Sequence, residues 1–262
     1  MCLWIMGAMA IDENHPDFVT ALARGLAVIR TFERGAEQQT LSQVAAKTQL
    51  SRGSARRFLL TLEALGYVAQ EGNAFKLSPK VLDLGYSYLA SLPLWEKAQP
   101  YMKEIVDKID ESCSLGVLEL PDVVYIARVP PRHVYTIPVQ VGTRMPAYVN
   151  AMGRVLLAAL SDDELSRYFA ALEPRQLTPH TVTDISRLRE IVANVRTCGY
   201  AMPEHEVYEG RRSLAVPISN REGKTVAAIN ISAMNSRASR ETFTNEYLPI
   251  LRRAAELIGS SL

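Results

Sequence analysis

The chain has 262 residues, of which 48% are hydrophobic and 22% charged, with a formal net charge of +1. This length predicts two domains, each able to bury an ordinary core, and the near-zero charge means that any nucleic-acid site must be a local basic patch. Cys2, Cys113 and Cys198 lie far apart without a C-x-x-C pair, which argues against a disulfide scaffold or zinc site and favours a reducing, cytoplasmic location.

The N-terminal stretch Met1–Ala10 is apolar but has no basic segment and is far shorter than the roughly 20 residues of a membrane span. It continues directly into Asp12-Glu13. We therefore expect residues 1–16 to be a disordered extension, and we expect no membrane partner.

Three helices are predicted next. An amphipathic helix that ends at Gly35 is predicted from apolar residues at three- and four-residue steps, namely Phe18, Leu22, Leu26, Ile29 and Phe32. The Thr40-Leu-Ser-Gln43 sequence has the form of a capping box and starts a short helix through Lys47. Ser51 caps a third helix that reaches Leu65 and stops at Gly66. Two helices so close together predict a helix-turn-helix.

A hairpin and a linker helix are expected after the third helix. Tyr67-Val-Ala and Phe75-Lys-Leu flank Glu71-Gly72-Asn73, which predicts the β-hairpin of a wing. Ser78-Pro79 is a cap followed by a proline in the first turn, and the helix that it begins stops before Pro93. These signals predict a winged helix-turn-helix over residues 17–78, a linker helix over 79–93 and a second domain over 94–262.

The second domain is expected to mix helices and strands in an α+β fold. The predicted strands are 114–120, 123–129, 213–218 and 226–232, with turns at Pro121-Asp122 and Asn220–Lys224. The predicted helices cover Trp95 to about Asp110, 149–160, a segment capped by Ser161 and Glu164, 184–198 closed by Gly199, and 239–258 with a kink at Pro249.

The third helix carries a local basic patch. Ala55, Phe58, Leu59, Leu62 and Leu65 form its expected buried stripe. Arg52, Gly53, Arg56 and Arg57 then face outward, and with Lys47 they are opposed only by Glu63. The arginine fork suits phosphate and guanine, whereas the simpler alternative is a solvated charged face. A helix-turn-helix with a wing favours DNA binding over that alternative and over a protein-binding adaptor.

Three blocks of this region resemble the DNA-binding module of isocitrate-lyase-regulator (IclR) proteins. They are Thr40-Leu-Ser-Gln-Val-Ala45, the run from Leu50 to Val68, and Phe75-Lys-Leu-Ser-Pro-Lys-Val-Leu-Asp-Leu-Gly85. The resemblance implies that the third helix enters the major groove of double-stranded operator DNA, while the wing contacts its backbone or minor groove. The implied DNA-contacting residues are Thr40, Ser42, Gln43, Ser51, Arg52, Gly53, Ser54, Arg56, Arg57 and Asn73. The resemblance also implies a homodimer or homotetramer, with RNA polymerase as a further candidate partner.

The second domain is similar to the GAF-like effector domain of the same family, so the resemblance covers the chain from about Asp17 to Ile258. It rests on the run from Val141 to Ala158, on Gly210-Arg-Arg-Ser-Leu-Ala-Val-Pro217 and on Ala228-Ile-Asn-Ile-Ser232. The implied binding residues for a small carboxylic acid are Asn150, Ala151, Met152, Gly153, Glu204, His205, Ser213, Asn230 and Ser232. Free N–H groups at a helix start and strand hydroxyls suit a carboxylate.

Structural alternatives stay open for these positions. Gly153 could serve close helix packing, Asn150 a helix cap, and Ser213 and Ser232 hydrogen bonds between strands. His205 could be an exposed loop residue. Arg144 is expected to form structural ion pairs.

The sequences of the third helix and of Val141–Tyr148 are similar to those of the subgroup that controls aromatic-acid catabolism (PcaR, PcaU and PobR types). That similarity implies protocatechuate, 4-hydroxybenzoate or β-ketoadipate as effector, which would shift the geometry of two DNA-binding modules through the linker helix. The first alternative is a regulator of another carboxylic-acid pathway, and the second is a small-molecule hydrolase. We expect no catalytic residues, metal or cofactor, since hydrolase and phosphate-loop motifs are missing and nothing in the sequence brings Cys113 and His133 together.

Overall fold

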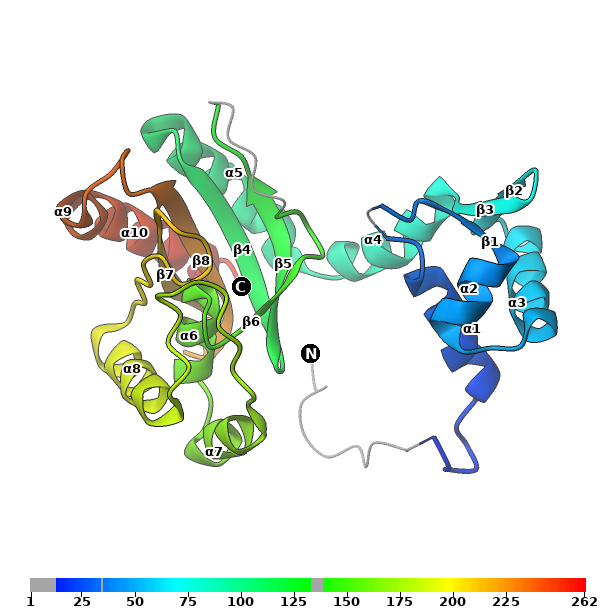
Figure 1. The fold of residues 1–262 in the computed structure, drawn as a ribbon. Helices are drawn as coiled ribbons and strands as arrows, with labels where there is room; N and C mark the ends of the chain where they lie inside the picture. The colour runs from blue at the N-terminus through cyan, green and yellow to red at the C-terminus, as the bar shows by residue number, and fades with distance from the viewer. Residues whose placement is uncertain (1–12, 34, 133–138) are drawn as a thin grey trace. The chain divides into compact units, whose positions relative to one another are not determined.

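The computed structural model describes residues 13–33, 35–132 and 139–262 (Figure 1). The chain divides into one compact unit that ends at Tyr88 and another that begins at Leu89. The predicted disordered extension falls mainly on residues 1–12, which lie outside the described residues. Residues 13–17 form turns.

The N-terminal unit packs helices against a small antiparallel sheet of order β1-β3-β2. Its elements are α1 (Thr20–Arg30), β1 (Gln38–Thr40), α2 (Leu41–Thr48), α3 (Arg52–Ala64), β2 (Val68–Glu71) and β3 (Ala74–Leu77). The 3₁₀ turn η1 (Pro79–Val81) leads into α4 (Leu82–Ala90), which crosses the boundary between the units. The predicted helix-turn-helix, wing and linker helix are confirmed, whereas β1 had no signal in the sequence.

Local caps explain where these helices begin. Thr40 N–H donates to Gln43 Oε1 (2.8 Å) and Gln43 N–H donates to Thr40 Oγ1 (3.4 Å), so the predicted capping box is confirmed. Ser51 Oγ accepts from Ser54 N–H (3.2 Å) at the start of α3. Ser78 occupies the predicted N-cap position before Pro79, but its hydroxyl donates to the Gly66 carbonyl and makes no capping hydrogen bond.

The buried core of this unit differs from the apolar stripes that were predicted for the first and third helices. It contains Val28, Val44, Ala45, Ala55, Leu59, Leu62, Val68 and Phe75. Leu22, Leu26 and Leu65 are exposed by 63%, 44% and 53%, because the faces of α1 and α3 that meet in the core do not include these positions. Gly35 also does not end α1, since the helix already stops at Arg30.

The C-terminal unit is a mixed α/β domain around an antiparallel sheet of order β6-β5-β4-β8-β7. Its strands are β4 (Ser112–Glu119), β5 (Asp122–Val129), β6 (Arg144–Pro146), β7 (Arg211–Ser219) and β8 (Thr225–Met234). Its helices are α5 (Pro93–Ile109), α6 (Ala151–Ala158), α7 (Asp162–Ala171), α8 (Ile185–Cys198), α9 (Arg240–Thr242), the π-turn η2 (Phe243–Tyr247) and α10 (Leu248–Ser260).

Helices cover both faces of this sheet, as Figure 1 shows. On one face, alternate side chains such as Cys113, Leu214 and Ile231 pack in one core with residues of α5 and α10. On the other face, Tyr125 and Ala228 join the core built with α6, α7 and α8. The sheet is therefore buried on both sides, and any polar cluster on it has a structural or functional reason.

Most predicted elements of this unit are confirmed, including the β4–β5 hairpin, the Ser161–Glu164 capping box and the Gly199 stop at φ +75°. The helix expected over 239–258 is confirmed as an unbroken helical run from Arg240 to Ser260. The π-turn Phe243–Tyr247 interrupts its regular hydrogen bonding just before Pro249, where the kink was predicted.

Candidate functional site

The outer face of α3 is a basic surface in the N-terminal unit. Arg52, Arg56 and Arg57 are exposed, whereas Ala55, Leu59 and Leu62 on the opposite side are buried. No carboxylate of a described residue forms an ion pair with these three arginines. Their guanidinium groups are therefore available to phosphate or base edges.

The remaining predicted DNA-contacting residues lie near the surface of the same unit. Ser42, Gln43, Ser51, Gly53 and Asn73 are exposed, and Thr40 and Ser54 are partly exposed. A Cβ atom on Gly53 would meet nothing within 4 Å, so this position leaves open space beside the helix. The expectation that only Glu63 opposes the basic residues is wrong, because Lys47 Nζ lies 2.9 Å from Glu33 Oε1.

A cavity in the C-terminal unit is lined by polar side chains from four neighbouring strands. Ser112 and Ser114 come from β4, Asn230 and Ser232 from β8, and Arg128, Arg211 and Ser213 from β5 and β7. Ser114 is paired with both Arg128 and Asn230, and Ser232 with both Ser112 and Ser213. Two rows of polar side chains thus run across the strands, on the same face of the sheet against which α6 packs.

A bulge in β5 is what puts Arg128 into this cavity. Ala127 pairs with Leu115 and Tyr125 with Gly116, so Ile126 is the extra residue. In a regular strand, residues three apart would point to opposite faces. The bulge turns both Tyr125 and Arg128 toward the cavity, while Ile126 packs in the opposite core.

The start of α6 forms another wall, but two of its N–H groups are already occupied. Asn150 Oδ1 accepts from Met152 N–H (2.9 Å) and Gly153 N–H (3.3 Å). The Asn150 amide also donates to the Tyr125 hydroxyl (2.8 Å). Asn150 is therefore a helix cap as well as a lining residue, and these two N–H groups are not free for a carboxylate as the sequence reasoning expected.

The cavity is electropositive. Burial, and then repulsion from Arg211, lower the pKa of the Arg128 guanidinium. Arg211 Nη2 lies 3.3 Å from both the carbonyl and the hydroxyl oxygen of Ser232. Glu206 lines the same cavity, but Arg154 neutralises it with two 2.7 Å hydrogen bonds. The described lining residues thus give Arg128 no carboxylate partner, and Arg211 adds a second guanidinium group to the same lining.

Family comparisons place both units. The family described as the IclR helix-turn-helix domain matches residues 21–72, and the C-terminal domain of the bacterial transcriptional regulator IclR matches residues 86–260. The chain belongs to the IclR family. IclR proteins are transcriptional regulators and not enzymes, and the N-terminal unit is their DNA-binding helix-turn-helix.

Three relatives illustrate the similarity to other IclR proteins. The Pca regulon regulatory protein of Pseudomonas putida is 39% identical over 92% of this chain and 84% of its own length. A transcriptional regulator from Rhodococcus sp. RHA1 superposes with a TM-score of 0.85 at 47% identity, over 92% and 97% of the two chains. An IclR homologue from Microbacterium hydrocarbonoxydans, solved with 4-hydroxybenzoate, gives a TM-score of 0.80 at 25% identity, over 91% and 97%.

Five of the predicted effector residues gather in the cavity, namely Asn150, Ala151, Ser213, Asn230 and Ser232. Ser213 Oγ donates to Ser232 Oγ (2.8 Å), so the alternative of paired strand hydroxyls also holds. Asn230 Oδ1 is buried without a hydrogen-bond partner among the described residues. This orphaned acceptor favours a donor group from a ligand or water at that point.

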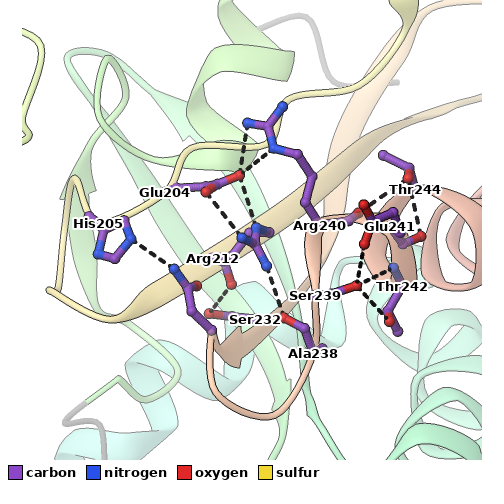
Figure 2. A network of polar contacts seen from close by, with 11 residues as sticks. Glu204, His205, Arg212, Ser232, Ala238, Ser239, Arg240, Glu241, Thr242 and Thr244 are labelled. Atoms are coloured by element: carbon purple, nitrogen blue, oxygen red, sulfur yellow. Dashed lines mark hydrogen bonds and ion pairs between the residues drawn. The ribbon is translucent and has the colours of Figure 1, made fainter.

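The other four predicted effector residues lie outside the cavity lining. Met152 and Gly153 are buried in α6, where a Cβ on Gly153 would approach the Ala147 carbonyl oxygen to 2.2 Å. Glu204 and His205 belong to a polar network that Figure 2 shows. Glu204 pairs with Arg212 (2.9 Å) and Arg240 (2.8 Å), and the His205 ring lies 2.8 Å from the Asn235 amide.

This network holds a segment that forms one wall of the cavity. Pro203, Glu206, Val207 and Tyr208 all line the cavity and lie beside or between the anchored residues. Arg212 additionally donates to the Ala238 carbonyl (2.9 Å) and lies over the Phe243 ring. Glu204 and His205 thus position the wall from behind, rather than facing the cavity as expected.

Several residues that line the cavity were not among the effector-binding residues predicted from the sequence. Ser112, Ser114 and Arg211 follow the period-two alternation of their strands, so a strict face assignment could have found them. Arg128 gave no such signal, because only the bulge points it inward. Arg144 behaves as predicted, with ion pairs to Glu119 (3.1 Å) and Asp122 (3.2 Å).

The described residues contain no helix with the length and apolar content needed to cross a bilayer, and no group of His, Cys, Asp or Glu arranged to hold a metal ion. Cys113 is fully buried, and burial raises the pKa of its thiol well above the ordinary range. Such a thiol is a poor nucleophile. His133 lies outside the described residues.

Proposed function

We propose that this chain is an IclR-type regulator whose DNA affinity responds to a small carboxylic acid of aromatic catabolism. The observation that carries the proposal is the electropositive cavity of the C-terminal unit, with Arg128 and Arg211 on one side and Tyr125 and Met145 among its other lining residues. Guanidinium groups beside aromatic and apolar surface suit a flat acid. The 39% identity to a Pca regulon regulator and the homologue solved with 4-hydroxybenzoate support the same class.

For the DNA, we infer that α3 enters the major groove and the β2–β3 hairpin follows the backbone beside it. Exposed Arg52, Arg56 and Arg57 would contact phosphates and base edges, and the exposed Asn73 at the hairpin would contact backbone. The other proposed contacts are Thr40, Ser42, Gln43, Ser51, Gly53 and Ser54. A protein that reads DNA in this way binds as a homodimer or homotetramer on a repeated or palindromic site.

Calorimetric titration tests the effector part. Protocatechuate, 4-hydroxybenzoate and β-ketoadipate are titrated into the full chain, with benzyl alcohol as a neutral aromatic control. We expect saturable heat from at least one acid and none from the alcohol. Absence of heat with all three acids would remove the aromatic-catabolism assignment and favour a regulator of another carboxylic-acid pathway, without touching the DNA-binding assignment.

A further inference from the structure

Arg128 is a half-buried cation with an unusual environment. None of the described carboxylates forms an ion pair with it, and the charged group of its own sign that acts on it is Arg211. Removing a guanidinium from water costs free energy unless an anion replaces the lost hydration. The β-bulge in β5 nevertheless turns Arg128 to the cavity side of the sheet, where its guanidinium group loses part of its hydration.

The two acidic residues that line the cavities beside Arg128 are already paired with other arginines. Glu206 is held by Arg154 with both oxygens at 2.7 Å. Glu111 lines a second small cavity that also touches Arg128 and Arg211, and it accepts from Arg237 Nε at 2.5 Å. The described lining residues therefore supply no anion for Arg128, which leaves its guanidinium group open to an anionic ligand.

We propose that Arg128 is the carboxylate anchor of this cavity, an inference that rests on the proposed effector function. Its planar fork presents two parallel N–H groups to one carboxylate, a geometry that a lysine does not match. Arg211, held over β8 by Ser232, adds a second positive group at the same end. The acid therefore binds to the sheet side of the cavity, and not to the capped N–H groups of α6.

The other lining groups fix how the rest of the ligand lies. Val139, Met145 and Ala151 offer apolar surface to a flat body. The Tyr125 oxygen accepts from Asn150, whereas its own hydrogen points to the Met145 sulfur at 3.7 Å, a weak acceptor. A ligand oxygen is a better acceptor for this hydroxyl. The ligand class that these groups suit is an aromatic carboxylate that also carries an oxygen substituent on its ring.

The anchor is tested by a double-mutant-type cycle, in which the Arg128 side chain and the carboxylate of the ligand are changed separately and together. The affinities of 4-hydroxybenzoate and of its neutral carboxamide are measured for the unmodified chain and for Arg128→Met, and likewise for protocatechuate and its carboxamide. For the unmodified chain, we expect the acid to bind about 30-fold more tightly than the amide, the size of a charge-assisted pair. In Arg128→Met, that preference falls to about threefold or less.

The matched control is Arg144→Met, which removes an arginine of the adjacent strand β6 whose charge is already balanced by Glu119 and Asp122. It should keep the full preference for the acid. Arg128→Lys retains the charge without the fork, is expected to recover part of the preference, and supplies the test if the methionine variant does not fold.

The outcomes separate the two claims. An unchanged preference for the acid in both Arg128 variants overturns the anchor and leaves the effector function standing. An unmodified chain that binds neither 4-hydroxybenzoate nor protocatechuate overturns the inferred aromatic ligand and the anchor with it, while the titration with β-ketoadipate decides the effector function. Equal affinity of the unmodified chain for acid and amide shows effector binding without a carboxylate anchor, and overturns the inference alone.

Discussion

Gly153 sets how closely α6 approaches the loop before it. A Cβ atom at this position would lie 2.2 Å from the Ala147 carbonyl oxygen, and both residues are buried. We predict that Gly153→Ala lowers the stability of the C-terminal unit by about 3 kcal/mol, because backbone has to move to relieve the overlap. Calorimetric melting of the full chain measures this loss.

Gly53 is the matched control, because a Cβ there meets nothing within 4 Å. Gly53→Ala should stabilise the N-terminal unit by up to about 1 kcal/mol through helix propensity. Equal melting of the Gly153 variant and the unmodified chain would contradict the close contact.

Arg56 is an exposed residue of α3 without an ion-pair partner among the described residues. We predict that Arg56→Ala leaves the melting temperature unchanged, weakens DNA binding at least tenfold and reduces the salt dependence of binding by about one released counterion. Anisotropy of a labelled duplex, obtained by selection from a random pool, measures both effects at several salt concentrations.

Arg253→Ala serves as the control for this variant, since Arg253 is an exposed arginine of α10 in the other unit. It should bind DNA like the unmodified chain. If Arg56→Ala does the same, α3 is not the recognition helix.

At the level of elements, helix ends could be predicted from sequence much better than the cavity. Thr40 with Gln43, and Ser161 with Glu164, cap their helices through residues three apart, so the information is local. The cavity depends on strand register and on one bulge opposite Leu115 and Gly116, which no local pattern reveals. For the same reason, β1 was missed: its pairing with β3 joins residues more than 30 positions apart.

The segment behind the cavity makes a prediction about pH. Hydrogen bonds from Arg212, together with its charge and that of Arg240, hold the pKa of Glu204 below the ordinary range. In the unfolded chain, this carboxyl titrates near the usual value of about 4.3. Its stabilisation is therefore present above that pH, and is lost as pH falls through the lower folded-state pKa.

We predict that Glu204→Gln melts a few degrees lower than the unmodified chain at pH 7, and that this difference shrinks steadily below about pH 4.3. Parallel melting curves between pH 7 and pH 3 measure the difference. A constant gap across that range would mean that the Glu204 charge does not stabilise the fold. The variant should also release the effector faster, because the cavity wall loses its anchor.

At the scale of the whole molecule, apolar side chains remain exposed on α1 and α4. Leu22 is 63% exposed, Leu82 70% and Tyr86 65%. Leu82 and Tyr86 lie about one helical turn apart on α4, and contiguous exposed apolar surface marks interaction sites. We predict that the chain self-associates through them, and that Leu82→Glu combined with Tyr86→Glu shifts sedimentation toward the monomer. Exposed Leu177→Glu on the C-terminal unit is the control and should sediment like the unmodified chain.

The central claim is that acid binding and DNA binding are coupled in one chain. Such coupling typically amounts to a change of about 5- to 150-fold in affinity, and it is reciprocal. The decisive measurement is the dissociation constant of the selected duplex with and without saturating acid, by anisotropy at fixed salt. We predict a change of at least fivefold, and an equal change in acid affinity when the duplex is bound. Identical DNA affinity with and without an acid that calorimetry shows to be bound would contradict the account.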